Sequence, residues 1–189
     1  MSNENNVIPY DIEYSDDNFD LEQCRISAES GYAHAQDNLG NCYKLGLYAK
    51  KDYNAAVAWF EKAAAQGDAA AQRSLGYCYE NGEGVKRDMA KAVALYEQGA
   101  NGGDPDAQCN IANCYAKGDG VKQDDEKAAF WYEKAAEQDH YIAQCNLANY
   151  YSEGRGVKQD YEKAFYWYTR GAELGDSFSQ NNLGSCYFY

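Results

Sequence analysis

The stretch AQRSLGYCYENGEGVKRDMAKAVALY, residues 71–96, contains the main features of a unit that recurs along this chain of 189 residues. Shifting the sequence by 36 residues realigns it without an insertion or a deletion. The pair Ala-Gln begins the unit at Ala35, Ala71, Ala107 and Ala143. An apolar residue follows four positions later, and a tyrosine follows eight positions later. Self-similarity at such a fixed period indicates a repeat protein.

Each unit is predicted to form two helices. In the quoted stretch, Ala71, Leu75 and Tyr79 recur at helical spacing and define the first helix. The second helix is predicted to begin after Asp88, because Asp is a favoured N-cap residue. The glycine-rich segments between the two helices, 82–85, 118–121 and 154–157, are interpreted as turns. A phosphate-binding glycine loop would instead follow a strand and occur once.

Three recurring columns are predicted to be buried. Gly within a helix costs about 1 kcal/mol relative to Ala, so its return at positions 40, 76 and 184 indicates close helix crossings. Three tryptophans share a second column and are predicted to lie in the core. The third column contains four cysteines, which are expected to act as small buried hydrophobes. The columns hold Trp59, Trp131 and Trp167, and Cys42, Cys78, Cys114 and Cys186.

The composition is acidic and poor in large aliphatic residues. The net charge is -13, and Leu, Ile, Val and Phe together number only 26, a combination typical of disorder. However, 28 alanines favour helices, and 19 tyrosines supply large contact area. The acidic excess disfavours nucleic acid as a partner. We expect no membrane insertion and a cytoplasmic location, since the sequence has neither a long apolar run nor a secretory signal.

The quoted stretch, written as Ala-x-x-x-Leu-Gly-x-x-Tyr followed by Gly-x-Gly-Val and Lys-Ala-x-x-Leu-Tyr, resembles the Sel-one-like repeat (SLR), a relative of the tetratricopeptide repeat. The resemblance covers residues 16–189. It implies an all-α fold, a right-handed α-α superhelix (solenoid) of 36-residue helix-turn-helix repeats. It also implies that the first helix of each pair lines the concave side and that the protein is a scaffold or adaptor.

The predicted organisation follows from the repeat register. Residues 1–15 carry no repeat pattern and are predicted to form a flexible acidic tail, and residues 16–189 are predicted to form the solenoid. A single helix pair cannot bury its own apolar stripe, so neighbouring repeats must cover it. The predicted parts are a leading half-repeat (16–34), full repeats (35–70, 71–106, 107–142 and 143–178) and a partial repeat (179–189). Because the chain ends in Tyr187-Phe188-Tyr189, we expect either truncation or self-association at this end.

Asparagines recur on the first helices, one residue before and two residues after the apolar column. Seven of these ten positions are Asn, although the chain has only 15 Asn in all. Positions three apart share a helix face, so stacking is expected to align the amides in a row. An amide both donates and accepts hydrogen bonds, as a peptide backbone does. The predicted binding residues are Asn38, Asn41, Arg73, Tyr77, Asn110, Asn113, Asn146, Asn149 and Asn182, with Lys44 and Tyr150 expected on the same face.

These observations predict a non-catalytic scaffold that binds a peptide or protein partner on its concave, Asn-lined face. The same Asn pattern has a second interpretation, in which the amides tie neighbouring repeats or loops together. A homo-oligomeric structural module, joined through the aromatic C-terminal end, is another alternative.

No catalytic residue, cofactor or metal site is predicted. The two histidines are far apart in sequence, and His140 occupies a column where other units have an N-cap Asp. The cysteines lack the C-x-x-C spacing of a zinc site. The resemblance also raises a cell-wall or β-lactam-related hydrolase, as in cysteine-rich bacterial relatives. This chain lacks the second cysteine per repeat that bridges the two helices in those proteins.

Overall fold

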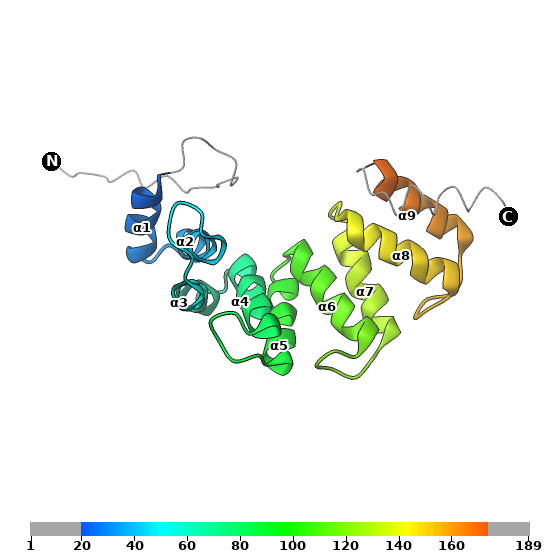
Figure 1. Ribbon diagram of the computed structural model, residues 1–189. Coiled ribbons are helices and arrows are strands. Elements are labelled where there is room, and N and C mark those ends of the chain that lie inside the picture. Colours follow the sequence, from blue (N-terminus) through cyan, green and yellow to red (C-terminus); the bar gives the residue numbers. More distant parts are fainter. Residues whose placement is uncertain (1–19, 174–189) are drawn as a thin grey trace. The chain divides into compact units, whose positions relative to one another are not determined.

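A computed structural model describes residues 20–173, and in this range the chain forms nine α-helices and no strand (Figure 1). Consecutive helices are joined as helix-turn-helix repeats, which confirms the predicted all-α repeat fold. The predicted tail 1–15, the partial repeat 179–189 and Asn182 lie outside the described residues. The helices are α1 (Leu21–Glu29), α2 (Ala33–Leu45), α3 (Tyr53–Ala65), α4 (Ala69–Asn81), α5 (Met89–Asn101), α6 (Pro105–Lys117), α7 (Asp125–Ala136), α8 (Tyr141–Glu153) and α9 (Tyr161–Glu173).

The chain divides into two compact units after Asp88. In the first unit, α2 packs against α1, α3 and α4, and α3 also packs against α4. In the second unit, each helix from α5 to α9 packs against the next. Since neighbouring helices cover one another's apolar stripes, each unit supplies its own core. None of the helices described is both long enough and apolar enough to cross a membrane.

Helix ends follow the predicted capping pattern. A carboxylate oxygen of Asp68 accepts a hydrogen bond from the Ala71 N–H at 2.8 Å, and Asp104 caps α6 in the same way. His140 takes this place at α8, where its Nδ1 accepts from the Ala143 N–H at 3.2 Å. These contacts satisfy backbone donors that have no partner within the helix.

The glycine-rich segments form tight turns that lie against the start of the preceding second helix. Gly156 has φ +63°, and a β-carbon there would lie 2.1 Å from the carbonyl oxygen of Asp125. Gly84 has φ +71°, and its β-carbon would lie 2.3 Å from the carbonyl oxygen of Tyr53. Both the left-handed backbone and the close approach require glycine, which supports the turn interpretation.

The main buried aromatic column of the second helices lies one residue after the tryptophan column. It consists of Phe60, Tyr96, Tyr132 and Tyr168, all buried. Of the three tryptophans predicted to lie in the core, Trp167 is buried, whereas Trp59 and Trp131 are half-buried. Trp59 still packs against a buried cluster that includes Cys24 and Leu39. The Lys62 ammonium covers the Trp59 ring, 3.7 Å from the ring centroid.

The cysteines are interior residues, as predicted. All six cysteines in residues 20–173 are buried free thiols. Burial raises the pKa of Cys42 and Cys78 to about 11, so both remain protonated and uncharged at neutral pH. They therefore contribute to packing as small apolar side chains.

Candidate functional site

The predicted Asn side chains differ in burial and hydrogen bonding between the two compact units. In the first unit, Asn38 is only 3 % exposed. It lies on α2, which is packed against three helices, and its repeat equivalent Ser74 on α4 is also buried. The prediction that Asn38 contacts a partner is therefore not supported by this packing.

Asn41 is held by a buried acid. Its Nδ2 donates to Oδ2 of Asp37 at 3.0 Å, one turn earlier on α2. Asp37 is 4 % exposed, and its Oδ1 has no hydrogen-bond partner. Burial and repulsion from Asp68 raise the pKa of Asp37 to about 6, although Arg73 and a hydrogen bond from Ser74 oppose this rise. The amide nitrogen of Asn41 is thus engaged inside the protein.

Arg73 and Tyr77 both lie on α4, and Arg73 interacts with the same acid. The Tyr77 ring is 41 % exposed, and the Lys44 ammonium lies 3.8 Å from its centroid. Arg73 is half-buried and interacts electrostatically with both Asp37 and Lys44. Burial lowers the pKa of Lys44. The first unit therefore carries a mixed charged and aromatic patch in place of an amide row.

In the second unit, four Asn side chains stay at the surface of α6 and α8. Asn110, Asn113, Asn146 and Asn149 are all half-buried, and we call them the amide row. The amides of Asn110 and Asn146 form no hydrogen bond with any residue that the structure describes. A polar side chain at a helix-interior position with no internal partner is free to bind another molecule.

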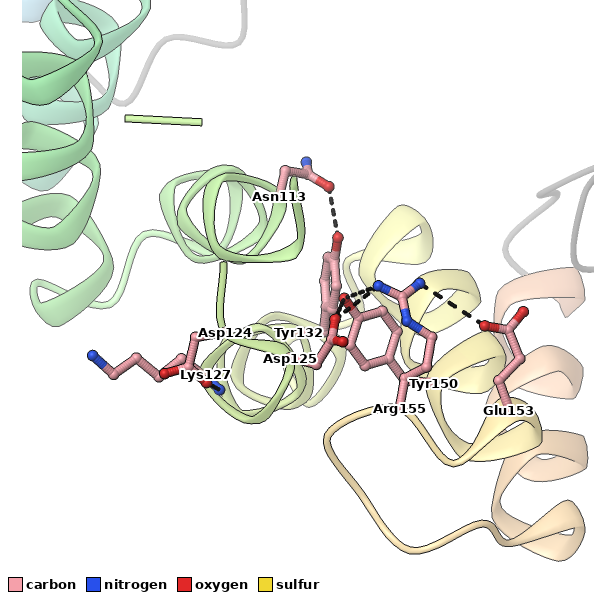
Figure 2. A network of polar contacts seen from close by, with 8 residues as sticks. All are labelled: Asn113, Asp124, Asp125, Lys127, Tyr132, Tyr150, Glu153 and Arg155. Carbon is pink, nitrogen blue, oxygen red and sulfur yellow. Dashed lines mark hydrogen bonds and ion pairs between the residues drawn. The ribbon is translucent and has the colours of Figure 1, made fainter. Parts of the chain in front are cut away.

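Asn113 and Asn149 each accept a hydrogen bond from a buried tyrosine. The Tyr132 hydroxyl on α7 donates to Oδ1 of Asn113 at 2.7 Å (Figure 2). The Tyr168 hydroxyl on α9 donates to Oδ1 of Asn149 at 2.5 Å. One atom of each amide thus ties the two helices of its own repeat together, whereas the alternative interpretation of the Asn pattern had the amides tie neighbouring repeats or loops.

A polar cluster that occurs in one repeat only lies behind Tyr132 (Figure 2). The Tyr150 hydroxyl donates to Oδ1 of Asp125 at 3.0 Å, and Nη2 of Arg155 lies 2.7 Å from the same oxygen. The Tyr150 ring packs edge-on against Tyr132, with centroids 5.3 Å apart. Burial and the bond to Asp125 raise the pKa of Tyr150 to about 12.

This cluster corrects one prediction and was not anticipated as a group. Tyr150 is buried against α7 and does not lie beside the amide row as expected. The signal in the sequence is that Tyr150 replaces the recurring cysteine of its column. The cluster links the turn at Arg155 to α7, which is a structural role.

A second recurring contact was also missed. The glutamine of each Ala-Gln pair donates its amide hydrogen to a carbonyl oxygen eight residues earlier, near the end of the preceding helix. Four such bonds, 3.0–3.4 Å long, join consecutive repeats within the two units. The recurrence of this glutamine in every 36-residue repeat was the signal in the sequence. The donors are Gln36, Gln72, Gln108 and Gln144, and the acceptors are Ala28, Ala64, Ala100 and Ala136.

His140 has a capping role in the described part of the chain. His140 caps α8, and its Nε2 lies 3.1 Å from Asp106 on α6. In residues 20–173, no group of three or more His, Cys, Asp or Glu side chains is placed to hold a metal ion.

Comparison with known families finds one match across the chain. The Sel1 repeat matches residues 33–68, 69–104, 105–140, 142–176 and 177–189. The first three matches have the 36-residue period of the predicted repeats and are shifted from them by two residues. No curated protein matches the chain.

Several solved structures are similar. A protective antigen of uropathogenic Escherichia coli strains, c5321, displays an SLR fold and is 44% identical with a TM-score of 0.84. The match covers 90% of this chain and 36% of the antigen, so the chain spans about a third of that protein. A Sel1 repeat protein from Oxalobacter formigenes is 37% identical with a TM-score of 0.83, covering 89% of this chain and 69% of its own.

A more distant structure shares the fold alone. Cysteine rich protein B of Helicobacter pylori is 21% identical with a TM-score of 0.57, and the match covers 73% of this chain and 99% of that protein.

Proposed function

The chain belongs to the Sel1 repeat family, and we propose that it is a non-catalytic scaffold whose amide row binds an extended peptide segment of a partner protein. Proteins of this family generally serve as scaffolds for protein interactions and are generally not catalytic. The proposal adds the location of the binding face and the kind of segment that it accepts.

The observation that carries this proposal is the state of Asn110 and Asn146. Both are half-buried, and their amides have no hydrogen-bond partner among the residues that the structure describes. Asn is unfavourable within a helix, so two such residues at equivalent positions of successive repeats weaken α6 and α8 without an internal benefit. A peptide backbone offers donors and acceptors at regular intervals, which matches amide side chains whatever residues the peptide contains.

The proposal is tested with linear peptides. Peptides selected from a displayed random library on the wild-type protein are measured by calorimetry against the double variant Asn110→Ala/Asn146→Ala. We expect the variant to lose about five- to 150-fold in affinity, because each of the two lost hydrogen bonds contributes about 0.5–1.5 kcal/mol. Its melting temperature should change little, since neither amide has an internal partner in the described range.

The matched control replaces two exposed asparagines away from the amide row, Asn54→Ala/Asn101→Ala. This variant should bind the selected peptides like the wild type. The proposal fails if no linear peptide binds the protein, or if the selected peptides bind the Asn110→Ala/Asn146→Ala variant with unchanged affinity.

A further inference from the structure

We infer that Tyr132 and Tyr168 are positioning residues that orient Asn113 and Asn149, so that the amide row presents N–H donors and binds backbone carbonyl groups of its partner. This inference rests on the proposed function and names the chemical group that the face recognises. The partner it fits is an extended polypeptide segment whose carbonyl oxygens are not already used in a helix or a sheet.

Each tyrosine hydroxyl binds the amide oxygen of one asparagine and so fixes the orientation of that amide. The hydroxyl hydrogens of Tyr132 and Tyr168 go to Oδ1 of Asn113 and Asn149, at 2.7 and 2.5 Å. Burial raises the pKa of Tyr132 above its ordinary value, so its hydroxyl remains protonated and able to donate. An amide whose oxygen accepts a buried hydrogen bond keeps its nitrogen on the opposite side.

The amide nitrogens remain available. Nδ2 of Asn113 lies 3.9 Å from Sγ of Cys109, a weak acceptor that occupies at most one of its two hydrogens. Nδ2 of Asn149 forms no hydrogen bond with any residue in the described part of the chain. Both side chains are half-buried. With each oxygen bonded to a tyrosine, the inference assigns contact with a bound segment to the nitrogens.

Contacts between Tyr132 and Tyr150 stabilise the orientation of the Asn113 amide. The Tyr132 ring packs edge-on against Tyr150 at 69°, and the Tyr150 hydroxyl is held by Asp125 (Figure 2). Arg155 binds the same carboxylate and lies 4.5 Å from the centroid of the Tyr150 ring. A side chain fixed in this way loses little further conformational freedom on binding, which favours affinity.

In the first unit the equivalent amide is bonded differently, and two of its neighbours differ: Phe60 stands in place of Tyr132, and Asp37 stands in place of Cys109. Phe60 occupies the position equivalent to Tyr132 and has no hydroxyl group. Asn41, which is equivalent to Asn113, donates from its nitrogen to Asp37. The same asparagine column therefore donates to a buried acid in the first unit and accepts from a buried tyrosine in the second.

Two pairs of substitutions test the inference with the peptides selected above. Asn113→Asp/Asn149→Asp keeps an oxygen for each tyrosine and replaces each outward donor with an acceptor. Tyr132→Phe/Tyr168→Phe removes the bonds that orient the amides, and Phe60 indicates that the column accepts Phe. We expect at least a tenfold loss of affinity for the first variant and a smaller, measurable loss for the second. The control Asn54→Asp/Asn101→Asp adds the same charge elsewhere and should retain wild-type affinity.

The outcomes separate this inference from the proposed function. If peptides that depend on Asn110 and Asn146 bind the Asp variant as tightly as the wild type, the orientation is wrong and the proposed function stands. If no peptide depends on Asn110 and Asn146, the proposed function fails. If circular dichroism shows that the Asp variant is unfolded, the Tyr→Phe variant decides: reduced affinity supports the inference, and unchanged affinity overturns it.

Discussion

The backbone of Gly40 on α2 lies so close to the Phe60 ring on α3 that a β-carbon at Gly40 would be 2.5 Å from a ring carbon. Mid-helix glycine is otherwise unfavourable, so the close crossing explains its presence and agrees with the predicted helix contact. Gly40→Ala should lower the free energy of unfolding by about 1–3 kcal/mol despite the better helix propensity of Ala, because the core must accommodate an extra methyl group. Urea denaturation measures this change.

If the Phe60 ring causes the loss of stability in Gly40→Ala, a double-mutant cycle will show it. In the Phe60→Leu background, Gly40→Ala should cost clearly less than in the wild type, since the smaller side chain leaves room. Equal costs in both backgrounds would show that the ring is not responsible.

The turn glycines should differ in their tolerance of a side chain. Gly156 and Gly103 both have positive φ, but a β-carbon meets the Asp125 carbonyl at Gly156 and nothing within 4 Å at Gly103. Gly103→Ala should cost about 1 kcal/mol from backbone strain alone. Gly156→Ala should cost substantially more, because its steric partner is backbone and cannot rotate away. Thermal denaturation of the two variants measures both losses of stability. Equal losses would contradict this prediction.

Asp37 should make stability depend on pH between about 4 and about 6. Its pKa is about 6 in the folded protein, whereas an unfolded Asp has a pKa of about 3.9. The folded state thus holds its proton more tightly, so protonation favours folding. The free energy of unfolding should fall as pH rises through this window, by up to about 3 kcal/mol, and stay lower above it.

Asp37→Asn should remove this part of the pH dependence. The free energy of unfolding of the variant minus that of the wild type should therefore be larger at pH 7.5 than at pH 4. Urea denaturation at both pH values measures this, with exposed Asp119→Asn as a control that leaves the slope unchanged. An identical slope in wild type and Asp37→Asn would mean that Asp37 titrates normally.

Gln144 should stabilise the second unit through the hydrogen bonds of its amide nitrogen, to the Ala136 carbonyl oxygen and, at 3.4 Å, to Oδ1 of Asp139. It is 0% exposed, and its Nε2 donates to the Ala136 carbonyl oxygen at 3.1 Å, near the end of α7. Gln144→Leu keeps a similar shape but removes the donor, so about 1–3 kcal/mol should be lost. Gln144→Glu should cost more, because a buried carboxylate cannot donate to a carbonyl oxygen and carries a charge. If both variants unfold at the wild-type urea concentration, these bonds do not stabilise the fold.

Local patterns were sufficient to predict most of the fold. The 36-residue period, the Asp and His140 caps and the Gly-x-Gly turns depend on contacts within a few residues of each other, and the structure reproduces them. Between the adjacent aromatic columns, Phe60 and Tyr132 are buried, whereas Trp59 and Trp131, which the sequence favoured, are half-buried. Residues that are neighbours in a helix point about 100° apart, and a shared period does not say which of them faces the partner helix.

The amide row was predictable only as a set of positions. Repetition placed asparagines at Asn38 and Asn110 alike, but packing buries the first and leaves the second half-buried without an internal partner in the described range. Likewise, Asn41 and Asn113 are the same residue in the same column. Asp37 binds the nitrogen of one, and Tyr132 binds the oxygen of the other.

There is a physical reason why the sequence predicts the helices but not the orientation of the amides. Helices, caps and turns arise from backbone geometry and short-range hydrogen bonds, which each 36-residue unit encodes in its own residues. The exposure of an asparagine and the direction of its amide arise from side chains on another helix, as Tyr132 on α7 shows for Asn113 on α6. Those partners come together after the helices have packed, so the repeat pattern alone could not assign donors and acceptors.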